Sequence, residues 1–271
     1  MRLDVGMVEQ GFVQSREKAA ALILTGKVYV NGKRAEKPGT TLKDGSTIEL
    51  AENSLPFVSR GGYKLEKAIK QFNLSLSEAI ACDIGASTGG FTDCMLQHGA
   101  KVVYAIDVGY GQLDWKLRND PRVVVMERMN ARNLHPGWFL EPMDFASVDV
   151  SFISLALILP NLRSCLKAGA FVVILIKPQF EAGRENVGKN GVVRNPLVHV
   201  ETCSRILKLS IDLGYTVCGF TFSPITGPKG NIEYLALLAA SANCKTISIY
   251  SQNLIEDTVS QAHSTLNGNR K

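Results

Sequence analysis

The sequence predicts an α/β protein in which helices cover a mostly parallel, seven-stranded Rossmann-like sheet, preceded by a small α+β domain. Two observations support this fold class. From residue 59 onward, short apolar runs of strand length alternate with segments whose apolar residues recur at helical spacing. Before that point the elements are short and are separated by turn signals. Strands separated by helices connect through right-handed crossovers, which make most neighbouring strands parallel.

The small domain is expected at residues 1–55. Ser15 is typical of a helix N-cap because its hydroxyl can accept a hydrogen bond from a free backbone N–H in the first turn. Two hairpin-type signals, Asn31-Gly32 and Asp44-Gly45, separate short runs of strand-forming residues. We therefore expect two helices and a small twisted sheet in this domain.

A linker is expected at residues 56–62, and the large domain at residues 63–271. Its strands are predicted at Ala79–Ile84, Val102–Ile106, Val123–Met126, Phe145–Val150, Phe171–Ile176, Tyr215–Phe222 and Ile232–Leu238. Its helices are predicted at Tyr63–Phe72, Phe91–His98, Gln112–Leu117, Ser154–Leu166 and Leu197–Leu213. Only a short loop precedes the last strand, which predicts that this strand inserts antiparallel. The tail from Asn267 is expected to fray.

Composition excludes several classes of protein. With 45% hydrophobic and 20% charged residues, the chain is neither disordered nor collagen-like. The net charge of +5 is compatible with a nucleic-acid partner without requiring one. No apolar stretch reaches the ~18–20 residues that cross a bilayer, and the N-terminus lacks the layout of a signal peptide. Six cysteines without a CxxC pair and four scattered histidines indicate buried thiols and no metal site. We expect a cytoplasmic monomer that binds neither metal nor membrane.

The loop after the first core strand is rich in glycine and leads into a helix, so a ligand can approach its backbone closely. A dinucleotide site requires a glycine where Ser87 stands, which disfavours NAD. S-adenosylmethionine has no phosphate, and its ammonium and sulfonium groups favour a carboxylate such as Asp83. Asp107 is placed to accept hydrogen bonds from ribose hydroxyls, and Asn130 to reach adenine. The alternative is a tight turn in which Asp83 merely caps the helix. The expected cofactor site comprises Asp83, Gly85, Ser87, Thr88, Gly89, Gly90, Phe91, Asp107 and Asn130.

Four charged residues form a second candidate site. Asp149 and Lys177 end predicted parallel strands, so both fall on the carboxyl edge of the sheet, where ligands bind in open α/β folds. Glu233, near the start of the antiparallel strand, lies on the same edge, and Lys64 lies on the helix that precedes the sheet. Lysine is rarely buried without a partner, so Lys177 is expected to pair with Asp149. Taken singly, each charge fits an ordinary ion pair; taken together, they predict a catalytic set.

This set resembles the catalytic tetrad of the FtsJ-like ribose 2′-O-methyltransferases. The chain is most similar to the TlyA family of rRNA methyltransferases, many of which carry the label haemolysin. The resemblance covers nearly the whole chain and is carried by Val58–Leu65, Asp83–Thr92, Asp149–Leu155, Ile176–Glu181 and Ser223–Tyr234. It implies a Rossmann-like fold that uses S-adenosylmethionine to methylate a cytidine 2′-hydroxyl in 16S and/or 23S rRNA. By this resemblance Lys177 acts as base or oxyanion stabiliser, Asp149 and Lys64 orient it, and Glu233 supports the set.

The N-terminal domain resembles the RNA-binding domain of ribosomal protein S4, on the strength of Arg2 to Asp4 and the run from Ser15 to Gly32. That resemblance implies a partner in ribosomal RNA or ribosomal subunits. The basic residues matched to RNA contact are Arg2, Arg16, Lys18, Lys27, Lys33 and Arg34. The polar loop from Glu181 to Asn195 is either an RNA-contacting lid or plain flexible surface.

Two interpretations from other functional classes remain. The family label allows a membrane-active haemolysin, which the lack of a spanning segment and of a strongly amphipathic basic helix disfavours. A non-catalytic RNA-binding protein that kept a methyltransferase fold is disfavoured by the complete set of four charged residues. The segment Asp149-Val150-Ser151-Phe152 also lacks the Pro-Pro-aromatic pattern of exocyclic-amine methyltransferases, which favours an oxygen acceptor.

Overall fold

The structure is a computed structural model, and it describes all residues except 14, 44, 51–55, 241–249 and 268–271. It divides into two compact units, Met1–Pro56 and Phe57–Lys271. Phe57 is buried in the core of the second unit, so residues 57–62, expected as linker, belong to that unit. Asp44, in the second predicted turn, and the tail from residue 268 lie outside the described residues.

The first unit contains two helices and a three-stranded antiparallel sheet, as predicted. Helix α1 spans Leu3–Glu9 and α2 spans Arg16–Leu24; the strands, in spatial order, are β2 (Lys33–Arg34), β1 (Val28–Val30) and β3 (Ile48–Leu50). The Ser15 hydroxyl accepts a hydrogen bond from Lys18 N at 3.3 Å and so caps α2. Leu3, Met7 and Ile23 are buried between the helices and the sheet and form the core of this unit.

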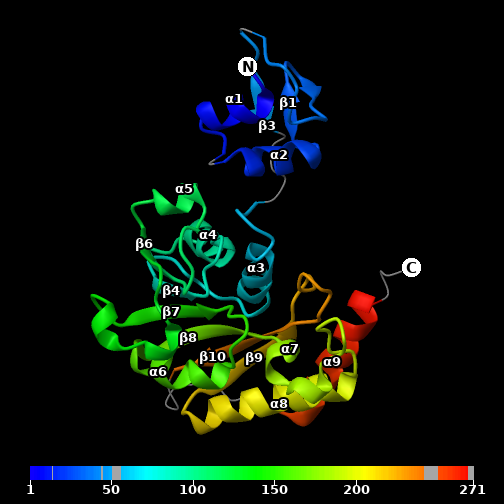
Figure 1. The fold of residues 1–271 in the computed structure, drawn as a ribbon. Helices are drawn as coiled ribbons and strands as arrows, with labels where there is room; N and C mark the ends of the chain where they lie inside the picture. The colour runs from blue at the N-terminus through cyan, green and yellow to red at the C-terminus, as the bar shows by residue number, and fades with distance from the viewer. Residues whose placement is uncertain (14, 44, 51–55, 241–249, 268–271) are drawn as a thin grey trace. The chain divides into compact units, whose positions relative to one another are not determined.

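The second unit is built on a seven-stranded sheet with spatial order β6-β5-β4-β7-β8-β10-β9 (Figure 1). The strands are β4 (Ile80–Ile84), β5 (Val102–Ile106), β6 (Val123–Met126), β7 (Met143–Val148), β8 (Leu166–Ile176), β9 (Thr216–Phe222) and β10 (Tyr234–Ala239). Strands β4 to β8 pair in parallel, whereas β10 runs antiparallel to both β8 and β9. The predicted mostly parallel sheet with a reversed last strand is confirmed.

Helices cover both faces of this sheet. The helices are α3 (Gly62–Gln71), α4 (Gly90–Gln97), α5 (Trp115–Arg118), α6 (Leu159–Ser164), α7 (Pro178–Glu181), α8 (Pro196–Asp212) and α9 (Gln252–Asn267), with 3-10 turns at Ala131–Asn133, Pro136–Trp138, Leu155–Leu157 and Arg184–Asn186. Buried side chains of α3, α4 and α5 form one core with the sheet, and those of α6, α8 and α9 form another. The arrangement is therefore helix layer, sheet, helix layer (Figure 1).

Two helices differ from the prediction. The helix expected at Ser154–Leu166 is split into a 3-10 turn and α6, because Pro160 has no N–H to continue the ladder and stands in the first turn of α6. Helix α9 was not predicted, although Ile255, Val259 and Ala262 recur at helical spacing and are buried.

The sheet brings several chain segments to one edge. The strands β4, β5, β7 and β8 all end there, and because β10 is reversed, it begins there: Tyr234 pairs with Ile176, the last residue of β8. Residues just after these parallel strands and just before β10 therefore meet at this edge. Within the described part of the chain, no helix has the length and apolar character needed to span a bilayer.

Candidate active site

Four charged side chains form a continuous network at the carboxyl edge of the sheet. Lys177 Nζ lies 2.5 Å from Asp149 Oδ1, and Lys64 Nζ lies 2.6 Å from Glu233 Oε2. The two pairs are joined because Lys64 Nζ also lies 3.8 Å from Asp149 Oδ2. The structure thus brings together all four residues of the set predicted from the sequence.

The network is largely removed from water. Lys64, Lys177 and Glu233 are buried, with only 2% of Glu233 exposed. Burial lowers the pKa of Lys64, but the carboxylates of Asp149 and Glu233 outweigh it, and the pKa lies above its ordinary value. Lys64 is therefore an ammonium ion at neutral pH, which holds the two carboxylates in place.

Further polar groups complete the surroundings of the network. Lys177 Nζ donates a hydrogen bond to Ser151 Oγ at 3.1 Å, and Gln179 Nε2 donates to Glu233 Oε1 at 3.3 Å. Gln179 Oε1 is buried without a hydrogen-bond partner among the described residues. Lys177 retains donor capacity beyond Asp149 and Ser151, because an ammonium carries three N–H groups. One N–H of Lys177 is therefore left for another oxygen.

A cavity of about 460 Å³ opens beside Asp149. Its wall includes Asp149 and Ser151 on one side and Asp107 and Asn130 on another. The full lining is Gly85, Ser87, Ile106, Asp107, Val108, Gln112, Met129, Asn130, Ala131, Arg132, Asp149, Val150, Ser151, Phe152, Ile153 and Ile158. The volume lies within the ~300–1,000 Å³ that ligand sites occupy, so a nucleoside-sized cofactor fits beside the charged network.

Asp107 is oriented by the backbone at the mouth of β5. Its Oδ2 accepts a hydrogen bond from Ser87 N at 2.8 Å, and its Oδ1 accepts one from Gly109 N at 2.7 Å. Each carboxylate oxygen can accept further hydrogen bonds, which a pair of ribose hydroxyls could supply. Gly85 allows the loop to form, because its φ is +86° and a Cβ there would overlap the Asp149 carbonyl.

Asp83 is not part of the cavity wall. It is 1% exposed, and its carboxylate accepts hydrogen bonds from Thr92 N at 2.9 Å, Thr92 Oγ1 at 2.7 Å and Ser147 Oγ at 3.0 Å. Asp83 therefore ties β4 to the first turn of α4 and to β7, which is the helix-capping alternative considered above. Burial raises the pKa of Asp83 to about 7, although the hydrogen bonds from Thr92 and Ser147 act to lower it.

Of the remaining predicted cofactor residues, some line the cavity and others do not. Gly85, Ser87 and Asn130 line the cavity, whereas Thr88, Gly89, Gly90 and Phe91 lie outside its lining. Phe91 is buried in the core, and Gly89 starts α4 in the left-handed conformation, with a φ of +94°. The second half of the glycine-rich loop thus shapes the start of α4.

Two residues that the sequence analysis did not single out shape the loop after β7 at the rim of the cavity. Phe152 is 88% exposed, has a φ of +64°, lines the cavity and packs against Phe180 at 4.8 Å between ring centroids. Buried Glu181 accepts hydrogen bonds from Ser154 Oγ at 2.7 Å and Leu155 N at 2.8 Å, so it anchors the loop that carries Phe152. Both lie in motif segments, but nothing in a single sequence distinguishes an exposed phenylalanine from a core residue.

The loop from Glu181 to Asn195 is partly fixed. Asn231 accepts a hydrogen bond from Val193 N at 3.1 Å and donates one to Gly191 O at 2.9 Å. Buried His199 lies 3.0 Å from Val193 O through Nε2 and 2.8 Å from Tyr234 Oη through Nδ1. Burial lowers the pKa of His199 to about 4, so it is neutral at pH 7 and joins this loop to the start of β10.

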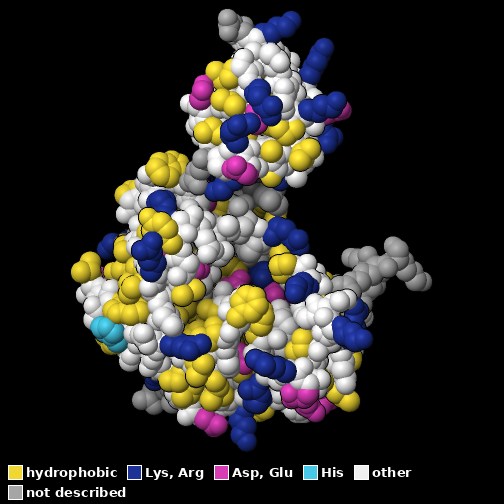
Figure 2. Space-filling view, in the orientation of Figure 1, with side chains coloured by type: hydrophobic (Ala, Val, Ile, Leu, Met, Phe, Trp, Pro, Cys, Tyr) yellow, Lys and Arg dark blue, Asp and Glu magenta, His cyan; other side chains and the backbone are white. Residues whose placement is uncertain are grey.

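The basic residues expected to bind RNA lie on the first unit. The guanidinium groups of Arg2 and Arg16 both bond to Asp4, at 2.9 Å and 3.0 Å. The hydrogen bond from Arg2 holds the pKa of Asp4 well below its usual range. Lys33 and Arg34 are exposed on β2, Lys18 is exposed on α2, and Lys27 is half-buried. Figure 2 shows lysine and arginine side chains spread over one face of this unit.

The strand order of the sheet and the charged residues at its carboxyl edge together define a class of protein. Dinucleotide-binding Rossmann sheets run parallel, whereas here the reversed β10 delivers Glu233 to the carboxyl edge. A seven-stranded sheet with this one reversed strand, and with a cofactor-sized cavity at its carboxyl edge, is the arrangement of an α/β methyltransferase. The chain belongs to the FtsJ-like methyltransferase family, which its residues 57–240 match. Residues 1–48 match the S4 domain.

Individual relatives agree with this family. A candidate rRNA methyltransferase from Bacillus subtilis, YqxC, is 51% identical over 98% of this chain and 95% of its own length. The 16S/23S rRNA (cytidine-2′-O)-methyltransferase TlyA of Mycobacterium tuberculosis is 42% identical over 96% of each chain. A solved structure of a candidate hemolysin from Streptococcus thermophilus has a TM-score of 0.77 and 48% identity, covering 99% of this chain and 98% of that one. The resemblance stated from the sequence is confirmed.

The raised pKa of Asp83 predicts a pH dependence of stability. Between about pH 4 and pH 7, the Asp83 carboxyl keeps its proton in the folded chain but has lost it in the unfolded chain. Asp83 therefore makes the free energy of unfolding fall as pH rises, by at most ~1.4 kcal/mol per pH unit. Asp83→Asn should remove this slope. Urea unfolding of both proteins from pH 4.5 to 7.5 measures it, with exposed Asp257→Asn as control. Parallel curves for wild type and Asp83→Asn would contradict the assignment.

Proposed function

We propose that this chain is an rRNA 2′-O-ribose methyltransferase that transfers a methyl group from S-adenosylmethionine to a cytidine 2′-hydroxyl in 16S and/or 23S rRNA. The observation that carries the proposal is the buried network in which Asp149 holds Lys177 at 2.5 Å beside a cofactor-sized cavity. The relative from Mycobacterium tuberculosis carries this activity in its name. An S4 domain on the same chain supports an RNA substrate.

The cavity chemistry fits S-adenosylmethionine. Asp107 is an oriented carboxylate for the two ribose hydroxyls, and Asn130 lies on the same wall for the adenine. The serine at position 87, and a described lining in which Arg132 is the one basic residue, make a pyrophosphate a poor fit. When bound, S-adenosylmethionine supplies an electrophilic methyl group on its sulfonium.

Lys177 is assigned to the acceptor oxygen. A ribose hydroxyl is a weak nucleophile, so the enzyme must align its oxygen and either remove its proton or stabilise the charge that develops on it. Asp149 and Ser151 occupy two directions around Lys177 Nζ and fix where the remaining N–H or lone pair points. Lys64, held by Glu233, also lies 3.8 Å from Asp149 Oδ2 and helps to position that carboxylate. Asp149, Lys64 and Glu233 are therefore positioning residues for Lys177.

Phe152 supports a single-stranded or flipped-out acceptor. A phenylalanine that is 88% exposed at a cavity rim offers a face on which a base can stack. RNA-binding proteins commonly hold unpaired bases on aromatic faces, since a base inside a duplex cannot be reached. We assign Phe152 to the base of the target nucleotide, next to Lys177 and the ribose.

Removing the Lys177 ammonium tests the proposed chemistry. Lys177→Ala should lower methyl transfer to rRNA by at least 100-fold, because the acceptor oxygen loses its only aligned lysine, while affinity for S-adenosylmethionine stays within several-fold. Tritium transfer to isolated subunits and calorimetric titration on the same samples measure both. Lys167→Ala is the matched control, since Lys167 lies near the other end of β8 and pairs with Asp144 on the surface. Near-normal turnover by Lys177→Ala would refute the assignment.

Removing the Asp107 carboxylate tests the cofactor site. Asp107→Ala should weaken S-adenosylmethionine binding by roughly 1–3 kcal/mol, the cost of losing hydrogen bonds to a charged group. Calorimetric titration measures the change, and exposed Asp114→Ala is the control for removal of a nearby loop carboxylate. Unchanged affinity in Asp107→Ala would move the cofactor to another part of the chain.

Removing the first unit tests whether RNA binding depends on the S4 domain while cofactor binding depends on the second unit. Residues 57–271 contain the whole seven-stranded sheet and all four charged residues, so this fragment should fold and bind S-adenosylmethionine. It should lose most methylation of ribosomal subunits, because the S4 domain supplies phosphate contacts that give affinity and register. Since phosphate contacts release counterions, the lost RNA affinity should be its strongly salt-dependent part. Equal methylation by fragment and full chain would exclude the S4 domain as substrate anchor.

A further inference from the structure

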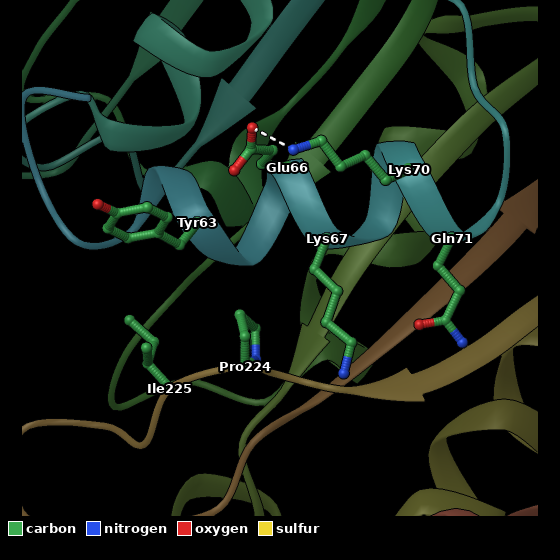
Figure 3. A pocket seen from close by; sticks show the side chains of 7 residues that line it. All are labelled: Tyr63, Glu66, Lys67, Lys70, Gln71, Pro224 and Ile225. Carbon is green, nitrogen blue, oxygen red and sulfur yellow. Dashed lines mark hydrogen bonds and ion pairs between the residues drawn. The ribbon is translucent and has the colours of Figure 1, made fainter. Parts of the chain in front are cut away.

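The second unit has another cavity, which none of the assigned residues uses. Its volume is about 610 Å³, larger than that of the cavity beside Asp149. One wall is α3 and the other is the segment that follows β9 (Figure 3). The lining residues are Tyr63, Glu66, Lys67, Lys70, Gln71, Pro224 and Ile225.

This cavity lies at the β9 side of the sheet, on the other side of Lys177 and Glu233 from the cofactor cavity. The cavity beside Asp149 is lined from the ends of β4, β5 and β7, whereas the second cavity is lined from the end of β9. In the sheet order, β8 and β10 come between them; Lys177 follows β8, and Glu233 precedes β10. Both walls also connect to the network: α3 carries Lys64, and Ser223 N donates a hydrogen bond to Glu233 O at 2.8 Å.

Lys67 is the unusual residue of this cavity. Its ammonium donates a hydrogen bond to Phe222 O at 2.7 Å and lies 3.7 Å from the centroid of the Phe222 ring. Burial lowers its pKa, and no carboxylate among the described residues lies within ion-pair distance of it. Lys70, by contrast, is paired with Glu66 at 2.7 Å. Figure 3 shows Lys67 pointing from α3 toward the Pro224 segment, while the Glu66–Lys70 pair lies on another side of the helix.

On the side that Lys67 faces, the lining is apolar or aromatic apart from Gln71, whose amide oxygen accepts a hydrogen bond from Thr221 Oγ1 at 3.0 Å (Figure 3). Pro224 and Ile225 form one surface, and the Tyr63 ring stands opposite them on α3 (Figure 3). Tyr63 is itself held edge-to-face by Phe57, with ring centroids 5.7 Å apart. A cation without a counterion beside an apolar slot matches a nucleotide, whose phosphate is anionic and whose base has two apolar faces.

We propose that this cavity binds the nucleotide adjacent to the methylated one in single-stranded RNA, with its phosphate on Lys67 and its base between Tyr63 and the Pro224-Ile225 segment. This inference rests on the proposed function and adds an RNA subsite to it. Because β8 and β10, next to Lys177 and Glu233, separate this cavity from the cofactor cavity, a nucleotide bound here fixes the RNA backbone on the side of the target ribose away from the cofactor. The subsite therefore aligns the 2′-hydroxyl with Lys177.

The test compares Lys67→Met with exposed Lys101→Met as matched control. Lys67→Met should raise the KM for naked rRNA and for subunits several-fold, with turnover at saturating RNA and affinity for S-adenosylmethionine within twofold of wild type. The slope of log affinity against log salt should fall by about 1, the contribution of a single phosphate contact. Lys101→Met should change none of these, and Lys67→Arg should retain most of the affinity.

A modified substrate locates the contact. A short target RNA with an uncharged methylphosphonate at the phosphate 5′ or 3′ of the target nucleotide should bind wild type less tightly at one of the two positions. At that position Lys67→Met should cause no further loss, because the two changes remove the same contact. Independent, additive losses at both positions would overturn the proposal.

Other outcomes are equally decisive. An unchanged KM and salt slope in Lys67→Met would refute the subsite while leaving the proposed function intact. A defect seen with subunits but not with naked rRNA would assign the cavity to a ribosomal protein instead of RNA. A fall in turnover alone would mean that Lys67 acts through α3 on Lys64. If the wild-type chain methylates neither rRNA, the proposed function itself fails.

Discussion

The burial of two lysine ammonium groups at one sheet edge is the constraint on which the rest of the active unit depends. A buried ammonium without a partner is strongly destabilising, so each lysine requires its own carboxylate at hydrogen-bond distance. Asp149 meets this need for Lys177 and Glu233 for Lys64, at 2.5 Å and 2.6 Å. Because the four groups come from α3, β7, β8 and the start of β10, those elements must converge for the charges to be balanced. The ion-paired network thus links catalysis to the assembly of the sheet.

Much of this could be predicted from sequence because strand topology converts sequence position into spatial position. Once Asp149 and Lys177 are recognised at the ends of parallel strands, they fall on one edge. The short connection before the last strand reverses its direction and brings Glu233 to the same edge, as the pairing of Tyr234 with Ile176 confirms. Lys64 followed from the resemblance more than from its position, since a lysine bordering an apolar helix stripe is common.

What could not be predicted depends on contacts distant in sequence. The direction in which the Asp83 carboxylate turns at the end of β4 is decided by Thr92 and Ser147, which donate hydrogen bonds to it. The exposure of Phe152 follows from its positive φ in a loop held by Glu181, and neither is visible in the pattern of a single chain. Helix α9, by contrast, has a periodicity that the sequence shows, with Ile255, Val259 and Ala262 at helical spacing.

The reversed strand β10 determines where in the sequence this enzyme can accept an inserted residue. β10 is hydrogen-bonded on both sides, with Tyr234 opposite Ile176 on β8 and Phe222 on β9. A residue inserted within β10 would turn every following side chain to the opposite face. A residue inserted in the loop between β9 and Asn231 leaves Glu233 where it is, because the ladder fixes the strand from both neighbours. The position of the Glu233 carboxylate is thus independent of the length of the loop that borders the second cavity, so that loop can change in length without displacing the ion pair between Glu233 and Lys64.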